Sequence, residues 1–245
     1  MLYDHFFNLY ILDLSQKVFY VCCLLVTTGG LCKTLQCPMK DNKMPWKNPC
    51  GTEGIEHKSS LPHNAADRTW ITNFISVLKE INDFFIELKV LICLDPAVQN
   101  LFNKRRYSDF DNQHLVGFPT ADTTKISNQA KLNISLEILD DYQKLAIVLV
   151  FVEQIVSEKD SYKGITDQDI LCNIYYKIRD VLCELRTQSE RTLIDEVTPT
   201  RNVMNSKYRK VDRISRLRRN YIIFKDASKY IRAISNKYWR LYFQI

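Results

Sequence analysis

Apolar residues recur at alternating spacings of four and three along residues 66–94, a pattern that predicts a long amphipathic helix. They are Trp70, Phe74, Val77, Ile81, Phe84, Leu88 and Leu91. Asp67 is a suitable N-cap for this helix. The pair Asp95-Pro96 ends the pattern, because proline cannot continue the helical hydrogen bonds. We therefore expect the first element to be one uninterrupted helix with one buried face.

Three further helical patterns follow, over residues 127–158, 166–193 and 215–245. The second is apolar on every side from 145 to 152, which is typical of the most buried helix of a bundle. Its β-branched residues are also compatible with a buried strand there, but the length of the whole pattern favours a helix. The third and fourth carry single apolar stripes, so all four patterns predict an all-α protein.

The connections between these helices alternate in length. The first and third are long, at roughly residues 96–126 and 187–214, and the second is the short turn at 159–165. A short connection makes neighbouring helices antiparallel, whereas ~20–30 residues can run the length of a ~40 Å helix and start the next one parallel to it. We therefore expect an up-up-down-down, long-chain four-helix bundle with two long crossover loops.

The N-terminus predicts a secretory signal peptide over residues 1–30. Lys17 precedes the apolar run 18–26, and small residues follow at 27–30. A run of about nine residues is too short to span a bilayer of ~30 Å. We expect cleavage near residues 29–31, a secreted, extracellular product and no membrane insertion after cleavage; a signal anchor is the alternative.

Residues 31–65 predict an irregular segment that contains prolines and cysteines, followed by the bundle over residues 66–245. Scattered Lys, Ser and Asn accompany four prolines in this segment. Trp46 either docks onto the bundle or stays loosely packed.

Cysteine usage favours an oxidising compartment. Two of the eight cysteines leave with the signal, and six remain: Cys32, Cys37, Cys50, Cys93, Cys172 and Cys183. An even number in a secreted chain predicts three disulfides. Cys172 and Cys183 share one predicted helix with ~16 Å of rise between them, so they cannot bond to each other. We expect Cys93 to pair with Cys172, and Cys183 to pair with a cysteine of the N-terminal segment.

The sequence contains no pattern typical of an enzyme. The four histidines lie in the predicted signal or in irregular segments, and no GxSxG, HExxH, Walker or GxGxxG motif occurs. Six glycines are few for dinucleotide-binding or phosphate-cradling folds. No His lies beside the cysteines at zinc-finger spacing. We expect no catalytic site, no metal site and no cofactor.

The net charge of +6 is concentrated towards the C-terminus. Arg218, Lys225, Lys229, Arg232 and Arg240 are predicted to share the side of the last helix opposite its apolar stripe. Three interpretations are open: a solvated face, a contact for an acidic receptor surface, or a site for sulfated glycans. Nucleic acid is not expected as a partner of a secreted chain.

Asn133 begins the sequon Asn-Ile-Ser early in the second predicted helix. Glycosylation there would require that edge of the helix to face solvent.

Residues 66–245 resemble the long-chain helical cytokines of the interleukin-6 class, and most of all the invertebrate unpaired-type ligands. The resemblance is carried by the signal, the four helices, the order of the crossovers and the basic, aromatic last helix, including residues 218–232. The Phe-x-x-Lys signature of some relatives is absent, because Phe224 is followed directly by Lys225 and Asp226. The receptor site that this signature serves in those relatives can therefore not be assigned to residues of this chain.

This resemblance implies a secreted signalling ligand that binds and bridges cell-surface cytokine receptors and activates Janus kinase/STAT signalling. Two other hypotheses stay open. One is an extracellular helical carrier of a hydrophobic small molecule, which would need an apolar cavity. The other is a reduced intracellular helical protein in which residues 1–30 are structural.

Overall fold

The computed structural model describes residues 44–51, 68–96, 99, 108–121, 134–158, 165–189, 191–209 and 211–243. All of them belong to one compact unit, residues 36–245. Within these ranges the regular secondary structure is helical and includes no strand, which confirms the all-α class for this part of the chain. The predicted signal peptide, residues 1–30, lies outside the described residues, as do Cys32, Cys37 and Asn133.

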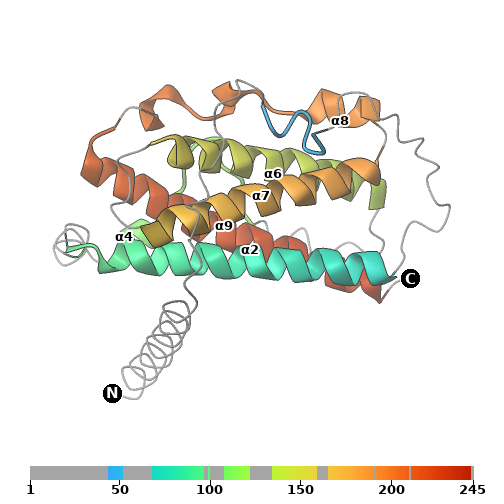
Figure 1. Ribbon diagram of the computed structural model, residues 1–245, viewed down its shortest axis with the longest axis horizontal. Coiled ribbons are helices and arrows are strands. Elements are labelled where there is room, and N and C mark those ends of the chain that lie inside the picture. The colour runs from blue at the N-terminus through green and yellow to red at the C-terminus, as the bar shows by residue number, and fades with distance from the viewer. Residues whose placement is uncertain are drawn as a thin grey trace, which may run out of the picture. The chain divides into compact units, whose positions relative to one another are not determined.

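Helices α2 (Arg68–Leu94) and α9 (Arg213–Tyr242) lie side by side and run in opposite directions (Figure 1). Phe74 near the start of α2 packs on Tyr238 near the end of α9, with ring centroids 4.6 Å apart. Further along α2, Phe85 packs on Phe224 at 6.0 Å. Of the predicted stripe, Phe74, Ile81 and Leu88 are buried, whereas Trp70, Val77, Phe84 and Leu91 are only partly buried. The buried face of α2 is displaced from the predicted stripe, because α2 contacts both α9 and α7. The additional buried residues are Ile71, Ile75, Leu78, Phe85 and Ile92.

Helix α6 (Ile134–Ser157) also runs opposite to α9. Lys237 near the end of α9 bonds Glu137 near the start of α6, and Arg219 near the start of α9 bonds Glu158 just after α6. The apolar segment 145–152 is almost entirely buried, as its sequence predicted. A helix that is apolar all round needs neighbours on every side, and α6 has α7, α8 and α9 around it.

Helix α7 (Ile165–Thr187) follows α6 after the expected short connection and packs against both α6 and α2 (Figure 1). The early part of α6 and the last turns of α7 meet the same short segment. Tyr142 of α6 and Arg186 of α7 bond to the adjacent carbonyl groups of Trp46 and Lys47. The two helices are therefore antiparallel.

The third helix was predicted to continue to residue 193, but α7 ends at Thr187. The Thr187 hydroxyl donates to the Glu184 carbonyl at 2.7 Å, a side-chain bond that competes with helix continuation. A separate short helix, α8 (Arg191–Val197), follows. The second long connection is thus partly helical and also includes the 3-10 turns η1 (Arg201–Val203) and η2 (Ser206–Tyr208).

The last helix begins at Arg213, two residues earlier than predicted. The carboxylate of Asp212 accepts hydrogen bonds from the backbone N–H groups of Ile214 and Ser215, at 2.9 and 3.0 Å. This side chain satisfies donors that the first turn leaves without helical partners, so Asp212 sets the start of α9.

The two long connections touch each other. Gly117, which follows the short helix α4 (Ser108–Asp111), has a φ of 84°, a conformation that favours glycine. A Cβ atom at this position would stand 2.7 Å from the carbonyl oxygen of Val203. The neighbouring N–H of Val116 donates to the Tyr208 hydroxyl at 3.3 Å. Glycine is therefore required here both for the turn and for the close contact.

Candidate interaction surface

One disulfide fastens the N-terminal segment to the helices. Cys50 and Cys183 are bonded, with their Cα atoms 4.9 Å apart, across 133 residues of sequence. This confirms the expectation that Cys183 pairs with a cysteine of the N-terminal segment. The bond holds residues 44–51 against the C-terminal half of α7.

The expected pair Cys93–Cys172 is not formed. Cys172 is disulfide-bonded, but the Cys93 sulfur is a thiol, so the partner of Cys172 lies outside the described residues. Helical spacing excluded the Cys172–Cys183 pair, but it did not identify which distant cysteine approaches Cys172. Which distant segments meet depends on the path of the loops through space. The hydrophobic periodicity of the sequence carries no information about that path.

Trp46 is fully buried, which settles the alternatives for this residue in favour of docking. Its indole N–H donates to the Pro199 carbonyl at 2.8 Å, and its own carbonyl accepts from the Tyr142 hydroxyl at 2.6 Å. The Arg201 guanidinium lies over the ring, 5.6 Å from its centroid. Trp46 therefore joins the N-terminal segment, α6 and the second long connection in one cluster.

Lys225 does not belong to the exposed basic face that was predicted for the last helix. Its side chain is only 3% exposed, and its ammonium donates to the carbonyl groups of Phe110, Asp111 and Gln113 at 3.1, 2.8 and 2.7 Å. Burial lowers the pKa of Lys225, and neighbouring Asp226 opposes that shift. The prediction was wrong because the end of α4 and the loop after it, residues 110–113, cover a side of α9 that the heptad pattern assigns to solvent.

Residues 110–113 also contact Arg218. Its guanidinium Nε donates to the Gln113 side chain at 3.2 Å, and the same group lies 5.1 Å from the Phe110 ring centroid. Arg218 and Lys225 together hold residues 110–113 against α9. Neither is available as a contact in the way the sequence predicted.

The other three candidate cations, Lys229, Arg232 and Arg240, are exposed on α9. They lie along one side of the helix, separated by uncharged residues, and the last of them is close to its C-terminal end. The basic face is therefore shorter than predicted and lies in the second half of α9.

An exposed aromatic cluster occupies the end of this line and was not predicted. Trp239 and Phe243 are 48% and 67% exposed. Trp239 stacks on Tyr242 with centroids 5.5 Å apart and 4° between the planes, and it meets Phe243 edge-on at 5.2 Å. The Arg68 guanidinium of α2 lies 5.4 Å from the Tyr242 ring centroid. The sequence signal was present: Trp239, Tyr242 and Phe243 are spaced three and four apart, outside the apolar stripe.

A buried ion cluster lies between α6 and α9. The Lys237 ammonium donates to Glu137 at 2.6 Å and to Asp141 at 2.7 Å, and the Tyr230 hydroxyl lies 3.4 Å from Asp141. Burial raises the pKa of Asp141 to about 6, although Lys237 opposes the shift. Lys237 of α9 bonds two carboxylates of α6, so the cluster fastens these two helices together.

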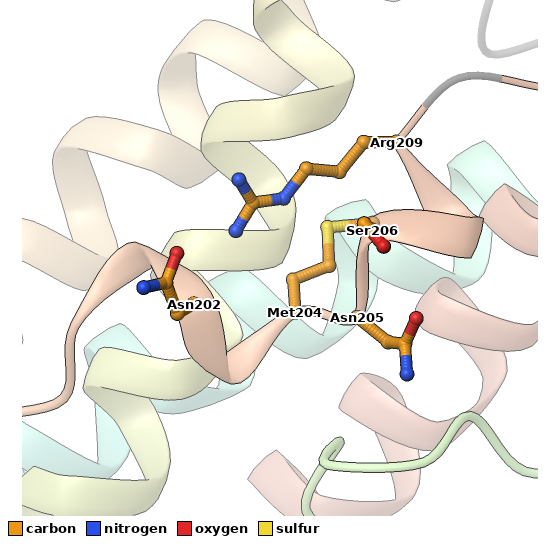
Figure 2. A pocket seen from close by; sticks show the side chains of 5 residues that line it. All are labelled: Asn202, Met204, Asn205, Ser206 and Arg209. Atoms are coloured by element: carbon orange, nitrogen blue, oxygen red, sulfur yellow. The ribbon is translucent and has the colours of Figure 1, made fainter.

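A hollow of about 300 Å³ lies on the second long connection (Figure 2). It is lined by Asn202, Met204, Asn205, Ser206 and Arg209, so all but one of its side chains are polar. A carrier of a hydrophobic molecule needs a predominantly apolar cavity. The lining of this hollow does not fit that use.

Among the described residues, no group of three His, Cys, Asp or Glu side chains is placed to bind a metal ion. No helix in the same part of the chain combines the length and apolar character needed to cross a bilayer. Comparisons with family models, curated proteins and solved structures found no match to this chain.

Proposed function

We propose that this protein is a secreted signalling ligand, an up-up-down-down four-helix bundle that binds and bridges cell-surface cytokine receptors and thereby activates Janus kinase/STAT signalling. It acts by presenting binding surfaces to its receptors. Bridging two receptor chains raises the effective concentration of one cytoplasmic tail near the other.

One observation carries this proposal: the pairwise helix directions. Helix α9 runs opposite to both α2 and α6, and α7 runs opposite to α6. If α2 and α6 point one way and α7 and α9 the other, the connections before α6 and before α9 must each travel the length of a helix. Two such crossovers distinguish the growth-hormone and cytokine bundles from simple up-down bundles.

The disulfide and the solid core agree with an extracellular ligand. Disulfides form and persist in oxidising compartments, and Cys50–Cys183 closes a long loop of chain. Large side chains such as Phe85, Tyr142 and Phe224 are fully buried between the described helices, and a ligand of this kind would act through its surface.

Binding to intact cells tests this proposal. The chain would be recovered from the medium of cells that express the whole sequence, labelled, and added to cells of the source animal. We expect secretion and saturable binding that is lost when surface proteins are removed with protease. Retention of the chain inside the expressing cells, or the absence of saturable binding on all receptor-bearing cells, would contradict the proposal.

A further inference from the structure

We propose that Cys172 is bonded to Cys37, so that residues 37–50 are fastened to α7 by one disulfide at each end. The Cys50–Cys183 disulfide is the other of the two bonds. The proposed bond belongs to the covalent structure of the chain, so it can be tested whether or not the chain binds a receptor.

The state of the described cysteines limits the partner of Cys172 to the N-terminal part of the chain. Cys172 is disulfide-bonded. Cys50 and Cys183 are bonded to each other, and the Cys93 sulfur is a thiol. The remaining cysteines of the sequence are Cys22, Cys23, Cys32 and Cys37. One of these four is therefore bonded to Cys172.

Cys172 and Cys183 lie on the same side of α7. They are eleven residues apart in the sequence. This spacing corresponds to about three helical turns, so the two cysteines are in line and ~16 Å apart along the helix axis. Residues 44–51 are already held at the lower end of this line, where Cys50 bonds Cys183 and Arg186 donates to the Lys47 carbonyl. A bond at Cys172 holds an earlier part of the same segment three turns nearer to the start of α7.

The contacts of Trp46 show in which direction this segment runs. The Arg201 guanidinium lies 5.6 Å from the centroid of the Trp46 ring, and Arg201 donates to Glu153 at 3.0 Å. Burial raises the pKa of Tyr175 to about 12, and both Glu153 and Arg201 are close enough to affect that pKa. Tyr175 is one helical turn from Cys172. Followed back towards the N-terminus, the segment therefore leads towards the start of α7.

Cys37 is the cysteine that can reach this position. Residues 36–245 form one compact unit, which contains Cys37 and α7 but not Cys32 or the two earlier cysteines. Cys37 precedes Met44 by seven residues. Seven extended residues span up to ~24 Å, and a disulfide needs Cα atoms within ~7 Å of each other. The chain is thus long enough to bring Cys37 to Cys172.

The chemistry of this bond is the same as that of Cys50–Cys183. Forming it removes two protons and two electrons from the thiols of Cys37 and Cys172. A disulfide oxidant of the oxidising compartment accepts them and becomes a dithiol. One thiolate attacks the oxidant's disulfide, and the second thiolate then displaces the oxidant's sulfur.

The proposed bond has two consequences for the molecule. It closes a long loop of chain, and restricting the unfolded chain in this way stabilises the fold. It also keeps residues 37–50 on one side of α7, which withdraws that side from the surfaces that a partner can contact.

Peptide mapping without reductant tests the assignment. Animal cells would express the whole sequence, and the chain would be collected from cells and medium with its thiols blocked by iodoacetamide. Trypsin cleaves after Lys33, which separates Cys32 from Cys37, and after Lys177, which separates Cys172 from Cys183. We expect peptide 34–40 linked to peptide 164–177, and peptide 48–58 linked to peptide 180–186. Linkage of peptide 164–177 to the peptide that ends at Lys33 or to peptide 90–104 would overturn the proposal. Recovery of Cys172 in its iodoacetamide-modified form would overturn it as well.

Two matched variants separate Cys37 from its neighbour. C37S should release the Cys172 thiol, which then appears as one additional iodoacetamide-modified cysteine, and should lower the temperature of thermal unfolding. C32S should retain the link between peptides 34–40 and 164–177. If C32S released the Cys172 thiol and C37S did not, the partner would be Cys32 and the proposal would be wrong. If C37S fails to fold, the peptide map of the wild type decides between the two cysteines.

Discussion

The hydroxyl of Tyr142 donates a 2.6 Å hydrogen bond to the carbonyl of Trp46, which lies 96 residues earlier in the chain. Both side chains are fully buried. The bond places an irregular N-terminal segment inside the helical core rather than on its surface. The segment therefore contributes to stability as a helix would, and its removal should affect the whole fold.

Trp46→Ala should lower the free energy of unfolding by about 3–5 kcal/mol, because it empties a large buried site and removes the bond to Pro199. Trp239→Ala provides a matched control. That ring is half-exposed, so its removal should cost about 1 kcal/mol or less. Urea unfolding followed by circular dichroism measures both. An equal loss of unfolding free energy in the two variants would contradict the docked position of Trp46.

The Cys50–Cys183 disulfide should stabilise the fold by about 2–5 kcal/mol, because it closes a long loop in the unfolded chain. The double variant with serine at both positions should unfold at lower denaturant concentration but keep its helical spectrum. Mass spectrometry of a protease digest without reductant provides the direct check. It should yield one linked peptide pair that contains both cysteines; finding them in separate peptides would contradict the assignment.

Lys225→Met should cost about 3 kcal/mol, because three carbonyl groups lose their donor in a buried setting and buried Asp226 loses its ion pair with Lys225. Lys229→Met removes the same charge from an exposed position of the same helix and should cost about 0.5 kcal/mol or less. Denaturant unfolding of the two variants measures the difference. A small and equal loss of stability in the two variants would mean that residues 110–113 do not depend on Lys225 for their position on α9.

Asp141 should make stability depend on pH in an unusual direction. Its pKa is raised to about 6 in the fold from 3.8, because burial disfavours the carboxylate. At a pH between these two values, the folded chain binds a proton at Asp141 that the unfolded chain does not. The stability that this proton contributes is lost as the pH rises through about 6. Lowering the pH from 7 to 4 should stabilise the wild type relative to Asp141→Asn by about 2–3 kcal/mol.

Asp180→Asn is the control for this prediction, because its carboxylate is exposed on α7 and is not among the groups that shift the pKa of Asp141. The wild type and Asp180→Asn should show the same pH dependence in thermal unfolding. If the stability of Asp141→Asn changed in parallel with that of the wild type from pH 7 to pH 4, the buried carboxylate would not be the titrating group.

Much of the helical arrangement could be predicted from periodicity. Residues 145–152 are apolar on all sides and are buried, since no other environment accommodates a helix without a polar face. The proline after Asp95 and the short connection before α7 located two helix ends within a few residues. The order of long and short connections is also readable, because it depends only on distances along the chain.

Periodicity could not predict what the loops cover. Lys225 lies opposite the apolar stripe of α9, yet residues 110–113 bury it with their own carbonyl groups. The pairing of Cys172 failed for the same reason, since it depends on the path of a distant segment. The sequence shows Trp239, Tyr242 and Phe243 at helical spacing, but their exposure depends on how α9 packs against α2, which leaves Trp239 and Phe243 in solvent.

The amount of tyrosine-phosphorylated STAT in receptor-bearing cells, measured soon after the secreted chain is added at increasing concentration, tests the signalling role most directly. The account predicts a saturable rise that a Janus kinase inhibitor abolishes. No rise at any concentration, in cells that carry the full set of cytokine receptors of the source animal and respond to another cytokine, would contradict it.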